Sequence, residues 1–504
     1  MRPRHSWRAL SALVLAVAGL VAMTLTTTLA VASPARAAGL HPHATSATPS
    51  KHSTILVLDM SGSMGANDPD GLRCSAANAY IDLSGPGDYI GVVGLTDPNG
   101  AHGGPHDFPT TVDWGLAPKE MATVKARESL RAAIAQKSNN CRPNGATPTY
   151  DSLAKAERML EAATQGGKIG GSVILLTDGA PDPSTDDQLK AIRSELVPQF
   201  KSHGWPVDTI ALGADQSFHG FLSDLSSATS GSFYDDGHGI VPGVSPLNIT
   251  PFFLNIFRVR NGRSPGPDIP PTQLDGGTTA RNFSVGQYVT HLDIVVVKDS
   301  PDAQVSIAAP NGQRFPPAAA GTFVSTDPHY AIFSIDNPQQ GAWEVDVQGS
   351  GLFLMDSLKV SALALNITAP NPTVPLALGE PFTITAQLSN QGSSISGGQF
   401  AVRGKLTYTG GENGKSRTQD VLLNDASGSG SYTAKVTVPT DAPAGSYQLA
   451  ISARAASEDV LTAQIVVRLA LFPSAQLISP ENGQATTKSV TASVVGFDGV
   501  LRAI

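Results

Sequence analysis

The chain has 504 residues, of which 42 are acidic and 34 basic, so its formal net charge is -8. This mildly acidic balance argues against nucleic acid as a partner, because nucleic-acid binding calls for basic patches. Hydrophobic residues make up 41% of the chain, which is enough to form apolar cores and argues against global disorder. The length suits roughly three domains of ordinary size.

The N-terminus has the pattern of an export signal. Three arginines lie in the first eight residues, an apolar run covers 9–25, and the small-x-small pattern Ala-Arg-Ala stands at 35–37. We expect 1–37 to be a signal peptide and the mature chain to be extracytoplasmic, secreted or at the cell surface. The alternative is an uncleaved signal anchor that tethers the chain by its N-terminus.

After a Ser-, Thr- and Pro-rich linker over 38–52, short apolar runs alternate with helical patterns as far as residue 262. This alternation predicts a doubly wound α/β domain over 53–262 with a mainly parallel sheet, whose ligands bind at the carboxyl ends of the strands. The expected strands cover 55–58, 89–95, 109–116, 173–176, 207–212 and 232–234. The expected helices cover 71–83, 119–135, 150–163, 186–200, 218–227 and 251–259.

The rest of the chain has the pattern of antiparallel β structure. A Pro- and Gly-rich stretch over 263–277 indicates a linker, and apolar residues then recur with period two between turn signals. We expect two all-β sandwich domains, the first over 278–365 and the second, with an immunoglobulin-like pattern, over 370–469. Residues 470–504 begin a further apolar segment, which we interpret as a partial module.

The chain has two cysteines, Cys74 and Cys141. In an exported protein a disulfide is the expected state of such a pair, and the predicted fold places both near one edge of the sheet. The alternative is two separate thiols.

Five oxygen-bearing residues occur where the predicted sheet would bind a ligand. Asp59, Ser61 and Ser63 follow the first buried strand, Asp178 follows the other, and Thr147 lies in a Gly-rich turn before a helix. If the two buried strands are central neighbours, the three loops meet in one crevice. Oxygen donors without Cys or His suit Mg2+, with Mn2+ or Ca2+ as alternatives, and argue against zinc.

The segments that carry these residues resemble a known site. DMSGS at 59–63, GATPTYDSL at 145–153 and LLTDG at 175–179 are similar to the metal-ion-dependent adhesion site (MIDAS) of von Willebrand factor type A (VWA) domains. The resemblance implies that Ser61, Ser63 and Thr147 contact the ion directly or nearly so, and that Asp59 and Asp178 act through waters. The alternative is that these residues only cap helices and form turns.

The resemblance implies an exported, metal-dependent adhesion protein whose ion coordinates an Asp or Glu of a protein partner, with the β-sandwiches as spacers or contacts. Neither the partner nor the oligomeric state is indicated. A structural envelope protein with a stabilising metal is an alternative. A hydrolase with an accessory VWA domain is a second one, but the sequence has no H-E-x-x-H or G-x-S-x-G motif. We therefore expect no enzyme and no small-molecule substrate.

Overall fold

The computed structural model describes residues 51–97, 114–164, 169–183, 185–213, 216–235, 239–241, 243–316, 322–395, 400–409, 418–455, 458–471, 474–476 and 493–495. The expected signal peptide and nearly all of the linker that follows it lie outside these residues. Within them, no helix has both the length and the apolar character needed to cross a membrane.

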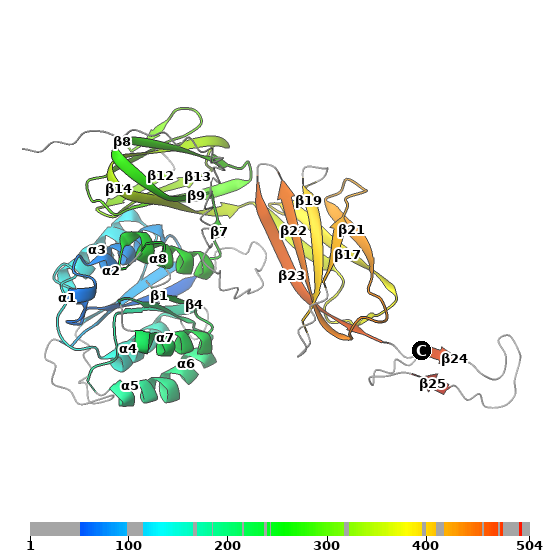
Figure 1. Cartoon of the computed structure of the whole chain (residues 1–504), viewed down its shortest axis with the longest axis horizontal. Coiled ribbons are helices and arrows are strands. Elements are labelled where there is room, and N and C mark those ends of the chain that lie inside the picture. The colour runs from blue at the N-terminus through cyan, green and yellow to red at the C-terminus, as the bar shows by residue number, and fades with distance from the viewer. Residues whose placement is uncertain are drawn as a thin grey trace, which may run out of the picture. The chain divides into compact units, whose positions relative to one another are not determined.

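An α/β region covers 51–262 (Figure 1). Its six-stranded sheet has the order β3-β2-β1-β4-β5-β6, in which all neighbours run parallel except the antiparallel pair β2 and β3. The two apolar strands β1 and β4 are central neighbours, as strands with both faces covered by helices should be. The strands are β1 (His52–Asp59), β2 (Asp88–Leu95), β3 (Trp114–Glu120), β4 (Gly170–Thr177), β5 (Val207–Ala211) and β6 (Phe233–Asp235).

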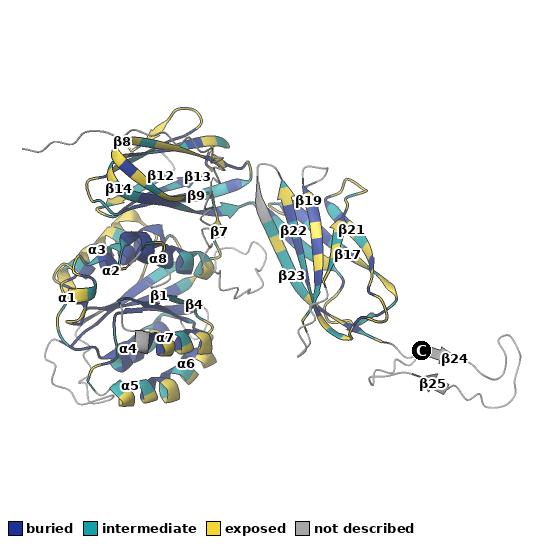
Figure 2. Cartoon of the chain, in the orientation of Figure 1, coloured by how far each residue is buried: buried dark blue, intermediate teal, exposed yellow. Residues whose placement is uncertain are grey.

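Helices cover both faces of this sheet (Figure 1). One apolar core contains side chains of α2, α3 and α8, and another contains side chains of α4, α6 and α7. Figure 2 shows the buried strands between the two helical layers. The helices are α1 (Met64–Asn67), α2 (Leu72–Leu83), α3 (Val124–Lys137), α4 (Thr149–Thr164), α5 (Thr185–Ala191), η1 (Ile192–Leu196), α6 (Val197–His203), α7 (Gln216–Ala228) and α8 (Pro246–Arg260).

The helix expected over 119–135 begins later than its pattern suggested. Lys119 belongs to β3, where it pairs with Ile90 of β2. The helix α3 begins at Val124, because the side chain of Thr123 accepts a hydrogen bond from the backbone N–H of Ala126 and caps the first turn. A local cap therefore decides this boundary, which the amphipathic pattern does not mark.

The closing helix is longer than the expected 251–259. It begins at Pro246, where the side chain of Ser245 accepts a hydrogen bond from the N–H of Leu247. Proline is favoured in the first turn of a helix because its missing N–H is not needed there. Pro251, which the sequence suggested as the first residue, lies inside the helix instead.

The first β region covers 264–361 and forms one antiparallel sheet around a single apolar core. Its long strand β14 pairs with β8 and β10 along its first part and with β9 and β7 along its last part. The strands are β7 (Ser264–Pro265), β8 (Ile269–Val285), β9 (Val289–Lys298), β10 (Gln304–Ala308), β11 (Arg314–Phe315), β12 (Thr322–Asp327), β13 (Tyr330–Asp336) and β14 (Gly341–Ser361).

The stretch expected to be a linker, 263–277, is largely strand. Residues 264–265 form β7, and β8 starts at Ile269, which pairs with Met355 of β14. Prolines 270 and 271 stand near the start of β8, a position that tolerates a missing N–H. The prediction of a linker from the Pro- and Gly-rich composition is therefore wrong, because most of this stretch is strand.

Strands β9 and β13 are buried on both faces, and the period-two pattern expected there is lost. One side packs into the core of the β region, and the other side, including Val295 and Val297, joins the apolar cluster of α2 and α8. A polar contact reinforces this junction, because Tyr330 Oη and Ser325 Oγ both donate to Asp82 Oδ2, at 2.8 Å and 2.6 Å. The α/β region and the first β region therefore share a buried interface.

The second β region covers 363–471 and has two sheets that enclose one core. Apolar and polar side chains alternate along its strands, as expected for a sandwich with solvated outer faces (Figure 2). One sheet contains β15 (Leu363–Ala369), β17 (Pro381–Asn390), β18 (Ser393–Ser394) and β21 (Ser431–Thr437). The other contains β16 (Leu376–Ala377), β19 (Ala401–Tyr408), β20 (Thr418–Leu423), β22 (Gly445–Ala455) and β23 (Glu458–Ala470). Beyond it, β24 (Ser474–Gln476) pairs with β25 (Ser493–Val495).

Candidate metal centre

The candidate site lies at the carboxyl ends of β1 and β4. These strands pair in parallel, with Leu58 opposite Leu176, so that the residues that follow them leave the sheet at the same edge. Strand β1 ends at Asp59, and β4 ends at Thr177, directly before Asp178. The sheet topology alone therefore brings the two predicted carboxylates to one edge.

The loop after β1 turns its polar side chains inward. The backbone N–H of Ser61 donates to Asp59 Oδ1 at 2.8 Å, and Ser61 Oγ lies 3.0 Å from Ser63 Oγ. Asp59 and Ser61 are buried, whereas Ser63 is exposed at the rim. The alternate spacing of the motif thus places one carboxylate and two hydroxyls on the same side of a short loop.

The carboxylate of Asp178 closes this network from β4. Ser63 Oγ donates to Asp178 Oδ1 at 2.8 Å, and Asn67 Nδ2 donates to Asp178 Oδ2 at 2.9 Å. Thr177 Oγ1 donates to Asp59 Oδ2 at 2.6 Å. Four of the five predicted site residues therefore lie in one hydrogen-bonded cluster.

Thr147 reaches the same edge through backbone contacts. The N–H of Asn144 donates to the carbonyl of Met60 at 2.6 Å, and the N–H of Gly62 donates to the carbonyl of Gly145 at 2.8 Å. Gly145 has φ of 90°, a left-handed conformation that favours glycine. Thr147 itself is buried, and among the hydrogen bonds of the described residues none uses its hydroxyl. All three predicted loops thus converge at one edge of the sheet.

Among the described residues, no cationic side chain forms an ion pair with the two carboxylates of this cluster. Burial, followed by the negative charge of Asp178, raises the pKa of the Asp59 carboxyl to about 6, although hydrogen bonds from Ser61 and Thr177 lower it. A bound cation would supply the missing positive charge.

The donor set defines which cation fits. The described residues contain no group of three or more His, Cys, Asp or Glu side chains placed to hold a metal. The predicted donors of the candidate site are two carboxylates and three hydroxyls. Such an all-oxygen set fits a hard divalent cation such as Mg2+, and it does not fit zinc.

A disulfide supports the loop that carries Thr147. The structure contains the expected bond between Cys74 and Cys141, whose Cα atoms lie 6.2 Å apart. Next to it, the buried Arg73 donates to the carbonyl of Cys141 at 2.8 Å and pairs with Asp68 at 2.6 Å. Asp68, which follows α1 closely in sequence, therefore has an arginine partner and caps α2 through two backbone N–H groups.

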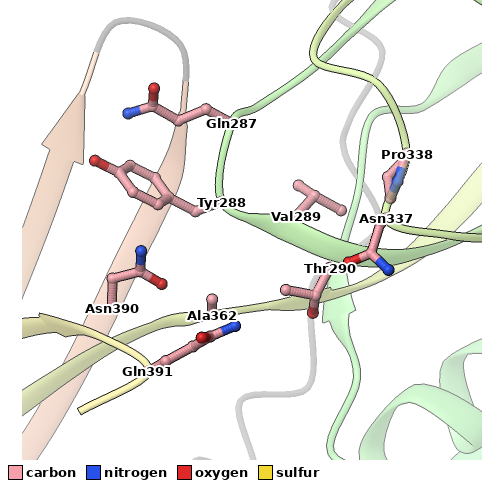
Figure 3. A pocket seen from close by; sticks show the side chains of 9 residues that line it. All are labelled: Gln287, Tyr288, Val289, Thr290, Asn337, Pro338, Ala362, Asn390 and Gln391. Carbon is pink, nitrogen blue, oxygen red and sulfur yellow. The ribbon is translucent and has the colours of Figure 1, made fainter. Parts of the chain in front are cut away.

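Apart from the candidate metal centre, a pocket is lined by residues of the first and second β regions (Figure 3). It has a volume of about 240 Å³, and its lining includes the amide side chains of Gln287, Asn337, Asn390 and Gln391 beside Tyr288. None of its lining residues is a carboxylate, an imidazole or an ammonium group. This pocket therefore offers hydrogen bonds but no acid–base pair and no set of metal ligands.

The sequence did not predict two residues that bond to the carboxylates of the candidate site, Thr177 and Asn67. Thr177 was visible as the residue before Asp178, but the pattern gave it no partner, since its bond runs to Asp59 on another strand. Asn67 follows the Asp-x-Ser-x-Ser loop by four residues and carries no recognisable signal. Only the folded arrangement shows that both hold the carboxylates.

The comparisons with known proteins assign no family. No family model and no curated protein matches the sequence. Among solved structures, the chain is similar to the human COPII-coat protein Sec24c, with 12% identity, a TM-score of 0.32 and coverage of 62% of this chain and 44% of that chain. It is also similar to the manganese-loaded Plasmodium vivax TRAP protein, with 15% identity, a TM-score of 0.28 and coverage of 46% and 86%.

A third similar structure is the Bacillus licheniformis lipase BlEst2 in its propeptide form, with 13% identity, a TM-score of 0.20 and coverage of 85% and 94%. The chain spans less than half of the length of the Sec24c chain. With TM-scores no higher than 0.32, these likenesses transfer neither a ligand nor an activity. The candidate site therefore depends on its own geometry.

Proposed function

We propose that the α/β region is a VWA domain that holds one divalent cation and uses it to bind a carboxylate of a partner protein. The observation that carries this proposal is the convergence of the segments that contain Asp59, Ser61, Ser63, Thr147 and Asp178 at one sheet edge. In the part of the chain that the structure describes, no ion pair involves either carboxylate. Mg2+ is the proposed ion, with Mn2+ or Ca2+ as alternatives.

The hydrogen bonds suggest different roles for the carboxylates and the hydroxyls of the site. Both oxygens of Asp59 and both oxygens of Asp178 already accept hydrogen bonds from the protein. The hydroxyls of Ser61, Ser63 and Thr147 would hold the ion, and the carboxylates would orient those hydroxyls. When bound, the ion supplies a positive charge that an outside carboxylate can neutralise, because its nearest protein ligands are uncharged.

We further propose that the protein works outside the cytoplasmic membrane as an adhesion or assembly factor and not as an enzyme. The signal-like N-terminus and the disulfide both suit an oxidising, extracytoplasmic compartment. The two β regions would serve as spacers or as additional contacts. The partner is a protein that presents an Asp or Glu side chain.

The test is a binding screen of the full chain against proteins of the exporting cell's surface, run in Mg2+ and again in EDTA. A specific partner should bind in Mg2+, and binding should fall at least tenfold in EDTA and in Ser61→Ala, since both remove the metal contact. Ser227→Ala is the matched control, because Ser227 is an exposed serine near the C-terminal end of α7. Equal binding by a specific partner in Mg2+ and EDTA would contradict the proposal.

A further inference from the structure

The side chain of Asn67 occupies a restricted place beside the candidate metal centre. Its Nδ2 donates to Asp178 Oδ2 at 2.9 Å, and since a carboxylate only accepts hydrogen bonds, this assigns the orientation of the amide. Gly213 also lies close to this side chain, because a Cβ added there would approach Asn67 Cγ and Oδ1 to 2.9 Å. The amide is therefore held between the loop after β5 and a metal-site carboxylate.

Gly213 has a second reason to be glycine, because its φ of 84° is strained for other residues. The loop that contains it begins at Leu212, whose N–H donates to the carbonyl of Thr177 at 2.9 Å. A backbone hydrogen bond thus connects the loop that contains Gly213 to the end of β4. The position of this amide is built into the fold.

Asn67 also decides how much negative charge the centre contains. With an amide at this position, the cluster has two carboxylates, Asp59 and Asp178, against the two positive charges of a divalent ion. A carboxylate at position 67 would be a third, placed against Asp178 Oδ2. Affinity of hard cations rises with the number of charged ligands, whereas an ion that is already neutralised gains less from an outside carboxylate.

We propose that Asn67 is a specificity-determining residue that limits the centre to two carboxylates, so that the bound cation retains its attraction for a partner's carboxylate. This inference rests on the proposed metal function and names the residue that balances ion retention against partner capture. A merely structural Asn67 would affect the folding of α1 and its surroundings, and it would move both affinities in the same direction or neither.

The experiment uses the full chain and two probes, Mn2+ and acetate. Calorimetric titration gives the Mn2+ affinity, and water-proton relaxation of bound Mn2+ reports how well acetate displaces water from the ion. Asn67→Asp should bind Mn2+ about tenfold more tightly and should bind acetate at the ion about tenfold more weakly. Asn67→Ala should bind Mn2+ several-fold more weakly, because Asp178 loses a donor, while acetate capture per bound ion stays near the wild-type value.

Asn311→Asp is the matched control, because it adds the same charge at an exposed position of the first β region and should change neither affinity. Melting curves in EDTA show whether each variant folds. If the wild type binds Mn2+ but Asn67→Asp leaves the two affinities unchanged or shifts them together, the inference about Asn67 is wrong while the metal site stands. If the wild type binds no Mn2+, the proposed function itself fails, and this inference fails with it.

Discussion

Five buried aspartates of the α/β region form two groups that differ in how their charge is balanced. In one group each aspartate has an arginine partner, and in the other, at the carboxyl ends of β1 and β4, Asp59 and Asp178 have only hydroxyl, amide and backbone donors. The first group consists of Asp68 with Arg73, Asp82 with Arg131 and Asp208 with Arg260. In the first group the balancing charge thus belongs to the chain, whereas at the ends of β1 and β4 the described residues form no ion pair with the two carboxylates.

The difference has a physical meaning, because a buried unpaired charge is costly and folded proteins avoid it unless it has a use. At the paired sites the positive charge is part of the chain, and at the sheet edge we propose that it comes from solution. Variants that remove an arginine partner, or that remove a carboxylate at the sheet edge, therefore test the comparison directly.

The largest expected effect comes from breaking a paired site. Arg260 Nε donates to Asp208 Oδ2 at 2.7 Å, and both side chains are largely buried. Arg260→Met should lower the free energy of unfolding by about 3–5 kcal/mol, because it leaves the Asp208 carboxylate buried without its partner. Urea unfolding should give the same loss in Mg2+ and in EDTA. A loss that Mg2+ restores would show that this pair belongs with the metal centre, against the comparison.

In the absence of metal, Asp59→Asn should not lower the free energy of unfolding and can raise it. The substitution removes a fully buried negative charge while keeping an oxygen that can accept from the N–H of Ser61. In EDTA the variant should be as stable as the wild type or more stable. Adding Mg2+ at about 100 times its dissociation constant should stabilise the wild type by about 3 kcal/mol and leave Asp59→Asn unchanged.

Calorimetric melting in both buffers provides the measurement for Asp59→Asn. Thr185→Val is not a suitable control, because its hydroxyl bonds to Pro181 in the loop after Asp178. Ser227→Ala serves instead and should respond to Mg2+ as the wild type does. Equal stabilisation of Asp59→Asn by Mg2+ would place the ion elsewhere.

The smallest expected effect concerns two carboxylates, those of Asp293 and Asp336, whose cationic partner His291 is charged only at low pH. His291 lies 3.0 Å from Asp293 and 2.7 Å from Asp336, and although burial lowers the pKa of His291, these two carboxylates raise it above its usual value. The stabilisation is therefore fully present below the unfolded-state value near 6.5, and it is lost as pH rises through the higher folded-state value.

His291→Gln removes this titrating partner and should cost about 1 kcal/mol at pH 6 and less at pH 9. Melting temperatures of the wild type and the variant, measured from pH 5 to pH 9, should converge as pH rises. A difference that grows with pH would contradict the assigned role of the histidine.

The sequence predicted the parts of this site that depend on local pattern. Unbroken apolar runs identified β1 and β4, and the Asp-x-Ser-x-Ser spacing identified the loop after β1. The convergence of Asp178 on that loop follows from β1 and β4 being neighbours, which the sequence analysis posed as a condition and the topology shows. The loop of Thr147 is brought there by backbone hydrogen bonds with Met60 and Gly62. Local pattern therefore predicted the loops of the candidate site, and the sheet topology shows that those of β1 and β4 leave the sheet at one edge.

What the sequence could not predict are contacts made across the fold. Arg260 lies 52 residues from Asp208, and no spacing rule connects them. The burial of β9 on both faces comes from helices α2 and α8 of another region, so the strand lacks the expected alternation. The contact of Asn67 with Asp178 could not be predicted for the same reason, because the two residues are 111 positions apart. Each of these features depends on tertiary packing.

The most direct test is a calorimetric titration of Mn2+ into the full chain after removal of metal with EDTA, for the wild type and for Asp59→Asn. The account predicts one bound ion for the wild type and a loss of about a hundredfold in affinity for the variant. A wild-type chain that takes up no ion, or a variant that binds the ion as tightly, would contradict the metal centre.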